Sequence, residues 1–180
     1  MPKYNSISDF IKVQERNWKD AVDPNKVLRA AVVTLVPEIK RRVQNDGKKS
    51  DGSQIGEYSD KTITGGPLAA RFNEVATKKQ IGRRLRAFGD TNEFYGYKDL
   101  RRSLGRQVAF VDLTLTGDMF LAFRAAPSGP NSYGYGFAGN QFKIAQYNEE
   151  RYGTVFDPSD TENKLTLNTI NKESTKLLSR

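Results

Sequence analysis

The sequence predicts an α+β fold in which a small, mostly antiparallel sheet packs on a long N-terminal helix, with short helices and extended terminal arms. Two patterns support this class. Apolar residues recur at helical spacing between residues 24 and 46, and they alternate with small or polar residues at 108–115 and 131–139. With 37% hydrophobic and 28% charged residues, a chain of 180 residues can bury one modest core.

The chain is predicted to divide into an N-terminal arm or helix, a core α+β domain with one basic insertion, and a C-terminal helical arm. The boundaries are residues 1–22, 23–157 with the insertion at about 61–107, and 158–180. The N-terminal arm is expected to be partly amphipathic because of four apolar residues, Phe10, Ile11, Val13 and Trp18.

The long helix has the clearest signals of any element. Asp23 is a suitable N-cap, and Pro24 suits the first helical position. The apolar residues that follow are spaced by three and four and define one face: Leu28, Ala31, Val32, Leu35, Ile39 and Val43. Pro37 lies inside this pattern and is predicted to kink the helix.

The middle of the chain carries weaker signals. Asp51–Gly52 predicts a turn in a hydrophilic loop that follows the long helix. Residues 78–90 fit either a short helix or an extended basic segment. Residues 97–107 fit a second short helix that ends at Gly105.

The sheet is expected to form from strands at 108–115 and 131–139, with a turn or loop at 127–132 between them. Between these strands, dense apolar residues follow Thr116–Gly117–Asp118. Thr116 is predicted to cap a short helix there, with Asp118 in its first turn, where the helix dipole favours a carboxylate.

The C-terminal third is predicted to be mostly helical. Asn140 is a candidate N-cap for a helix that stops at Gly153. Ser159 and Glu162 form a capping-box pattern that opens a last helix. Its apolar stripe is thin, so we expect it to need a partner surface, and its apolar residues are candidates for an inter-subunit arm: Leu165, Leu167, Ile170, Leu177 and Leu178.

The chain contains no His and no Cys. These residues supply the usual general base near neutral pH, the thiol nucleophile and the common zinc ligands, so we expect neither an enzyme nor a cofactor or metal. A carboxylate-dependent hydrolase acting on cell wall remains an alternative, tested through Asp112 and Glu149. No run approaches the roughly 18 apolar residues of a membrane span, so no membrane partner is expected.

The basic residues are concentrated in one window of the chain. Residues 61–110 hold 11 of the 29 Lys and Arg but only 4 of the 21 Asp and Glu. Aromatic residues are interleaved with them, a pattern that fits DNA, an acidic protein or a plain solvated face. The candidate contacts for a DNA channel or an acidic partner are Lys78, Lys79, Arg83, Arg84, Arg86, Arg101, Arg102 and Arg106. The alternative function is a small basic nucleic-acid-binding protein that uses residues 78–106.

Four stretches occur in an order that resembles a known group of proteins. They are "RVQNDGKKSDGSQIGEYS", "YKDLRRSLGRQVAFVDLTLTGDMFLAF", "YGYGFAGNQFKIAQYNEERYG" and "TVFDPSDTE". The order resembles that of the tail-completion and head–tail joining proteins of tailed bacteriophages, which include tail terminators and virion morphogenesis proteins. The motif residues that carry the resemblance are Asp51, Gly52, Tyr58, Leu115, Thr116, Gly117, Met119, Tyr135, Gly136, Phe137, Asn148, Glu150, Arg151, Tyr152 and Gly153.

The resemblance implies a structural function. Such a chain is a neck or tail ring subunit, in a head–tail connector, adaptor or tail-completion role, that joins the portal to the tail around the DNA channel. It implies a ring of six or twelve copies with head-to-tail contacts, portal or adaptor and tail proteins as partners, and non-specific proximity to packaged DNA. The implied location is the virion, after synthesis in the host cytoplasm.

Overall fold

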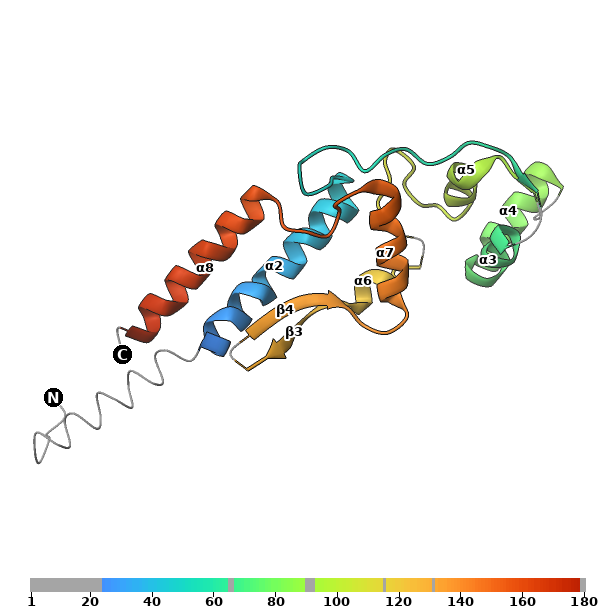
Figure 1. The fold of residues 1–180 in the computed structure, drawn as a ribbon. Coiled ribbons are helices and arrows are strands. Elements are labelled where there is room, and N and C mark those ends of the chain that lie inside the picture. The colour runs from blue at the N-terminus through green and yellow to red at the C-terminus, as the bar shows by residue number, and fades with distance from the viewer. Residues whose placement is uncertain (1–23, 65–66, 90–92, 115, 131, 179–180) are drawn as a thin grey trace, which may run out of the picture.

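The computed structural model describes residues 24–64, 67–89, 93–114, 116–130 and 132–178. The predicted N-terminal arm and its apolar residues, together with Asp23 as a helix cap, lie outside these residues. The elements in chain order are α2 (Pro24–Asp46), β1 (Ile63–Thr64), α3 (Pro67–Val75), α4 (Lys78–Phe88), β2 (Glu93–Phe94), α5 (Gly96–Ser103), α6 (Asp118–Ala122), β3 (Phe123–Gly129), β4 (Ser132–Phe137), α7 (Gln141–Tyr152) and α8 (Asp160–Leu178) (Figure 1).

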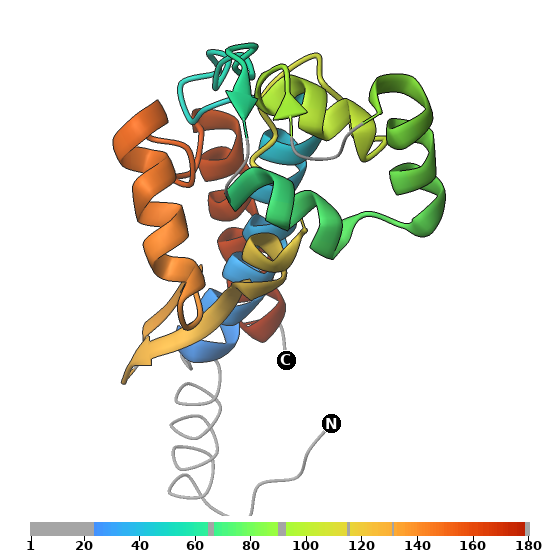
Figure 2. The ribbon, with the colours of Figure 1, turned by 90° about the vertical axis from the view of Figure 1, so that its right-hand side faces the viewer.

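The predicted α+β class is confirmed. Helices dominate, and the described residues form two antiparallel two-stranded sheets, β1–β2 and β3–β4. The β3–β4 hairpin packs against the long helix α2, as Figures 1 and 2 show.

The long helix α2 follows its sequence pattern closely. It buries the face that includes Ala31, Leu35, Ile39 and Val43. The helix runs from Pro24 to Asp46 with Pro37 inside it. The main core forms between this face and residues from the hairpin, α6, α7 and the loops: Val32, Leu35, Val36, Ile39, Val43, Ile55, Tyr58, Val111, Met119, Phe120, Phe123, Ala145, Val155 and Phe156.

The predicted strand at 108–115 is wrong, because its described residues adopt no strand. Backbone amides that would bond a neighbouring strand are bound by side chains instead. The amide of Asp112 donates to the Tyr58 hydroxyl at 3.0 Å, and the amide of Thr114 donates to Asp112 Oδ1 at 2.8 Å. Leu113 has a φ of 53°, which interrupts an extended chain.

The strand that pairs with 132–137 is therefore β3. Its register joins Phe123 to Phe137 and Ala125 to Tyr135. The expected loop at 127–132 is shorter than predicted, because β3 continues to Gly129 with a register irregularity after Pro127. Phe123 then packs 4.7 Å from Phe137, ring centroid to centroid, which places the paired strands' aromatic side chains in the main core.

The basic insertion forms a lobe of its own, which we define as residues 67–104. Figure 1 shows α3, α4 and α5 at the end of the molecule away from α8. A separate small core holds the lobe together: Ala69, Phe72, Phe94, Leu100 and Leu104. The helix option at 78–88 is confirmed as α4, and the second short helix is confirmed as α5, ending just before Gly105.

The C-terminal helix α8 lies alongside α2 of the same chain rather than extending as a free arm (Figure 1). The half-buried residues of α8 recur at helical spacing and define the side that is shielded: Thr166, Thr169, Ile170, Glu173, Ser174 and Leu177. This side is largely polar, which explains why the apolar stripe looked thin in the sequence.

Candidate functional site

Arg84, a predicted surface contact, is buried inside the lobe. Its guanidinium lies 3.0 Å from Asp99 Oδ2 and donates to Ser103 Oγ at 2.8 Å and to the carbonyl of Glu93. It also stacks over the Phe94 ring, 4.0 Å from the centroid. Arg84 therefore joins α4, α5 and β2 through its two terminal guanidinium nitrogens.

Arg101 is also buried, at 1% exposure, and it connects the lobe to the main body. It pairs with Asp112 Oδ2 at 2.7 Å and donates to the carbonyls of Gln107 and Thr114. Its guanidinium lies over the Tyr58 ring at 4.5 Å. A buried cation with these partners is a structural tie between two parts of the chain.

The other six candidate contacts of the basic window are exposed: Lys78, Lys79, Arg83, Arg86, Arg102 and Arg106. Exposed aromatic rings accompany them, because Phe88 and Tyr95 lie 6.3 Å apart and both are more than half exposed. We call these six cations the basic surface of the lobe; five lie within residues 67–104 and Arg106 lies just beyond them, and Arg83 and Arg102 line one pocket with Phe88. This arrangement suits a polyanion.

Two motif segments far apart in the sequence meet in the fold. The side chain amide of Asn148, on α7, lies 3.6 Å from the sulfur of buried Met119 on α6. Glu150 and Arg151 are exposed on the same helix, and Arg151 lies over the Tyr152 ring at 5.2 Å. α6 and α7 are thus in contact through residues that the resemblance selected.

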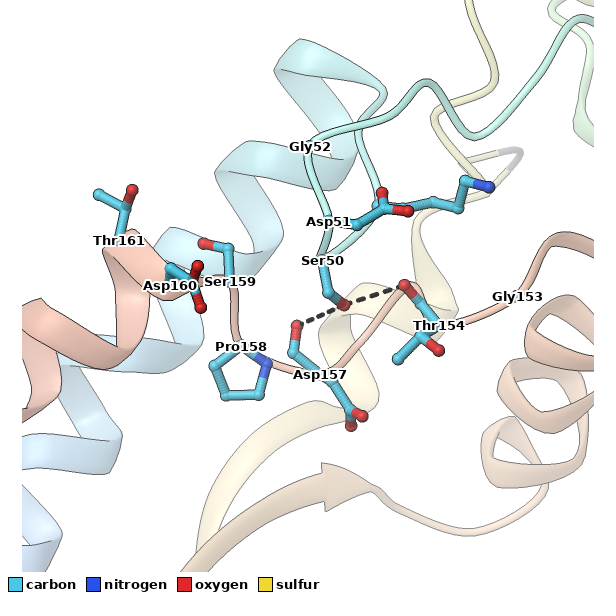
Figure 3. Close-up of a pocket in the computed structure, with 11 residues that line it drawn as sticks. Ser50, Asp51, Gly52, Gly153, Thr154, Asp157, Pro158, Ser159, Asp160 and Thr161 are labelled. Atoms are coloured by element: carbon cyan, nitrogen blue, oxygen red, sulfur yellow. Dashed lines mark hydrogen bonds between the residues drawn. The ribbon is translucent and has the colours of Figure 1, made fainter.

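A second convergence joins the Asp51–Gly52 turn to Gly153. These residues line an open groove of about 740 Å³, with the residues around the start of α8 on its other side (Figure 3). Ser50 ties the two sides together, because its hydroxyl lies 2.9 Å from both the Thr154 and the Asp157 carbonyl oxygens. Asp51 accepts hydrogen bonds from the amide and the hydroxyl of Ser53, which hold the pKa of its carboxyl below the usual range.

The predicted turn at Thr116–Gly117 leads into the short helix α6, as expected, but the cap differs. Gly117 occupies the N-cap position with a φ of 94°, a conformation that favours glycine. The Thr116 hydroxyl contacts Asp118 Oδ2 at 2.7 Å and the Asp118 amide at 3.4 Å. Leu115 lies outside the described residues. Asn140 likewise precedes α7 without a side-chain cap bond within the described chain.

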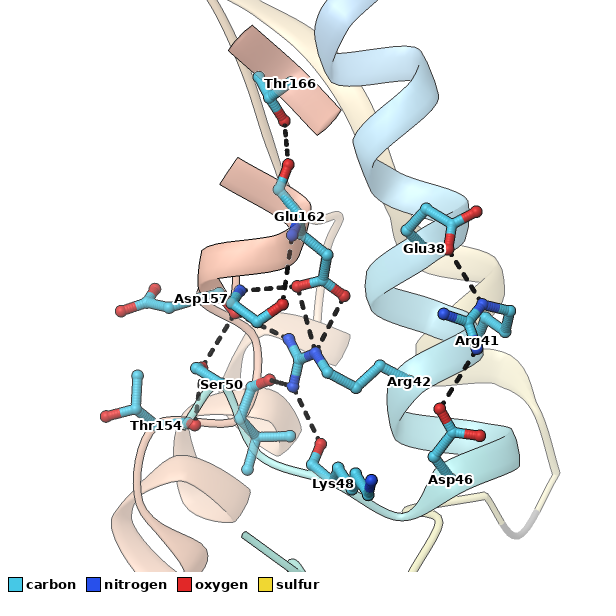
Figure 4. A network of polar contacts seen from close by, with 12 residues as sticks. Glu38, Arg41, Arg42, Asp46, Lys48, Ser50, Thr154, Asp157, Glu162 and Thr166 are labelled. Atoms are coloured by element: carbon cyan, nitrogen blue, oxygen red, sulfur yellow. Dashed lines mark hydrogen bonds and ion pairs between the residues drawn. The ribbon is translucent and has the colours of Figure 1, made fainter. Parts of the chain in front are cut away.

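The sequence did not reveal a buried network around Arg42. Its Nε lies 2.9 Å from Glu162 Oε1, and its other nitrogens donate to the carbonyls of Lys48, Val155 and Asp157 (Figure 4). Arg42 lies on the apolar side of α2, directly before buried Val43. In the sequence, the only sign of this network is a charged residue at a core-facing position of the helix, because such a residue is rarely buried without a partner.

An aromatic groove lies beside α7. It has a volume of about 510 Å³ and is lined by residues from four regions of the chain: Tyr58, Ser59, Tyr97, Val111, Leu113, Thr114, Ile144, Tyr147, Asn148, Arg151 and Tyr152. Within Gln141–Tyr152 only Ala145 is buried, whereas Tyr147 is 59% exposed. Burial raises the pKa of the Tyr58 and Tyr97 hydroxyls above their usual range, so both are neutral at physiological pH.

The candidate inter-subunit residues of α8 divide into two groups. Ile170 and Leu177 are half-buried, whereas Leu165 and Leu167 are exposed. The side chain of Leu178 lies outside the described residues. Of the described candidates, Leu165 and Leu167 are the ones exposed to another chain.

The two carboxylates considered as candidate hydrolase residues both accept hydrogen bonds within the fold. Asp112 is buried between Arg101, Gln107 and Tyr58. Glu149 accepts a hydrogen bond from the amide of Phe156 at 3.1 Å. Both carboxylates hold segments of the main body together.

In the described part of the chain, no helix is both long and apolar enough to cross a bilayer. Comparisons with models of protein families, with curated proteins and with solved structures gave no significant match.

Proposed function

We propose that this chain is a structural ring subunit of a bacteriophage neck or tail. In this role, as a head–tail connector, adaptor or tail-completion protein, it joins the portal to the tail around the DNA channel. The proposed role is structural and involves no catalysis. Other copies of the chain and the neighbouring rings would cover surfaces that the single chain leaves exposed. The observation that carries the proposal is the aromatic groove beside α7.

The groove has the chemistry of an assembly contact. Ile144 and Tyr147 belong to a twelve-residue helix that buries one residue, and its exposed side carries three large apolar side chains, Phe142, Ile144 and Tyr147, among polar ones. Exposed aromatic and aliphatic residues around a groove are typical of protein–protein contacts. A neighbouring copy inserted there would stabilise α7, which few intrachain contacts hold.

The contacts between motif residues support the resemblance on which the ring assignment depends. Asn148 reaches Met119, and Gly153 shares a groove with Asp51 and Gly52. Their convergence is what a shared architecture would produce.

Electron microscopy and native mass spectrometry of the purified protein test this proposal. We expect closed rings of six or twelve copies, and Tyr147→Asp should abolish them while the circular dichroism spectrum remains that of the folded chain. Val33→Asp is the matched control, because Val33 is also about half exposed but lies on α2, outside the groove. A wild-type chain that remains monomeric at all concentrations and with its neck partners would contradict the proposal.

A second candidate function is favoured by the basic surface of the lobe. Six exposed cations, together with the exposed rings of Phe88 and Tyr95, fit a small nucleic-acid-binding protein. This function predicts a monomer or dimer whose DNA affinity falls steeply with salt. The ring subunit, in contrast, should bind free DNA weakly at physiological salt.

A further inference from the structure

One small pocket in the lobe collects arginines from two helices. It has a volume of about 260 Å³ and lies between α4 and α5, lined by Gln80, Arg83, Arg84, Ala87, Phe88, Asp99, Arg102 and Ser103. This volume is below the roughly 300–1,000 Å³ of pockets that hold drug-sized ligands, so the pocket suits a small group.

The pocket presents more hydrogen-bond donors than acceptors. Arg83 comes from α4 and Arg102 from α5, both side chains are exposed, and neither forms an ion pair within the described residues. Ser103 Oγ accepts from Arg84, which leaves its hydroxyl hydrogen for another acceptor. Two guanidinium groups and a hydroxyl thus face one space.

Arg84 also lines this pocket, from its buried side. Its residue is 3% exposed, and its Nε is buried without a hydrogen-bond partner among the described residues. A buried unsatisfied donor of this kind is rare and calls for an acceptor. The carboxylate in the pocket, Asp99, is already bound by Arg84 and by the amide of Tyr95 at 3.1 Å.

We propose that this pocket binds one phosphate group, and that its ligand is a phosphodiester of the DNA backbone. Arginine forks match phosphate oxygens in geometry and charge, which lysine does not do as well. The inference rests on the chain meeting DNA, as both functions proposed above require. It adds that this one pocket, rather than the whole basic surface, binds the DNA backbone.

Matched pairs of substitutions separate the pocket from the general positive field. Arg83→Gln with Arg102→Gln removes two pocket cations, and Arg86→Gln with Arg106→Gln removes two exposed cations that do not line it. Both double variants lower the net charge equally. Duplex DNA of about 20 base pairs at low salt is the first probe, measured by fluorescence anisotropy, and inorganic phosphate is the second, measured by the shift in Tm.

We expect the pocket pair to weaken DNA binding about tenfold more than the control pair, since it removes charge-assisted hydrogen bonds as well as charge. Inorganic phosphate should raise the Tm of the wild type and the control pair, but not that of the pocket pair. Equal losses of DNA affinity in both pairs would overturn the proposal. If inorganic phosphate bound in the pocket but the two pairs lost DNA affinity equally, the assignment of the ligand to DNA would be overturned.

The outcome is distinguishable from that of the ring proposal. Rings seen by electron microscopy with no difference between the two pairs would remove the phosphate pocket and leave the structural function intact. If the pocket pair weakened DNA binding more than the control pair in a chain that never assembles, the phosphate pocket would stand and the ring function would be removed.

Discussion

The guanidinium of Arg42 and the carboxylate of Glu162, 120 residues apart in the chain, form a buried ion pair at 2.9 Å. Glu162 also accepts from the Ser159 amide at 2.7 Å, so one carboxylate caps the start of α8 and fixes that helix to α2. The capping box predicted from the sequence is present. Its glutamate also forms the ion pair with Arg42, which the sequence did not show.

Breaking this pair should be strongly destabilising. Glu162→Gln leaves the buried Arg42 cation without its counter-charge, and we expect a loss of about 3–5 kcal/mol in the free energy of unfolding by urea. The exposed pair Arg41–Glu38, one residue away on α2, is the control. Glu38→Gln should cost at most about 1 kcal/mol. Similar losses in both variants would show that burial does not set the strength of this pair.

Neighbouring arginines of α4 should respond differently to substitution. Arg84→Met strands the buried Asp99 carboxylate and should lower the stability of the lobe by about 3 kcal/mol or more, whereas Arg83→Met should change it by about 0.5 kcal/mol or less. Hydrogen exchange of the lobe amides measures both. Charge reversal at Arg84 is therefore unsuitable for testing DNA binding, because any loss could arise from unfolding.

The turn before α6 gives a second matched comparison. Gly117→Ala should lower stability by about 1 kcal/mol, because an alanine is strained at a φ of 94° although its Cβ has open space. Thr116→Ala should cost less than about 0.5 kcal/mol, since the Thr116 hydroxyl is exposed and does not cap the helix by a short bond. Thermal unfolding of the two variants measures both losses of stability. A larger loss of stability in Thr116→Ala than in Gly117→Ala would contradict the assignment of Gly117 as the N-cap.

Stability should fall in alkaline solution. Burial raises the pKa of Tyr135 to about 12 and that of Tyr58 further, against about 10 for an unfolded tyrosine. The folded chain then keeps protons that the unfolded chain loses, so this contribution is complete below about pH 10 and is lost as the pH rises from there.

Urea unfolding at several pH values checks this direction, with tyrosinate absorbance as a second probe. Tyr58→Phe should flatten the alkaline decline, while lowering stability at neutral pH by about 1–3 kcal/mol because the Asp112 amide loses its acceptor. A stability that stays constant from pH 9 to about 12 would count against neutral buried tyrosines.

The sequence alone determined the features that depend on neighbours within a few residues. The stripe of α2, the helix at 141–152 with its end at Gly153, and the Ser159–Glu162 capping box all follow from spacing and local hydrogen bonds. A further local signal was present at Thr77 and Gln80, whose reciprocal capping box starts α4 and selects the helix over the extended alternative.

Only the tertiary structure decided which segments meet. Alternation at 108–115 indicates a strand locally, yet burying Asp112 beside Arg101 and Tyr58 takes up the backbone donors that a strand would need, and 123–129 pairs instead. Likewise, a run of arginines looks uniform in sequence. Burial of Arg84 and Arg101 depends on carboxylates that long-range folding brings to them, so the difference between structural and exposed cations arises from three-dimensional contacts.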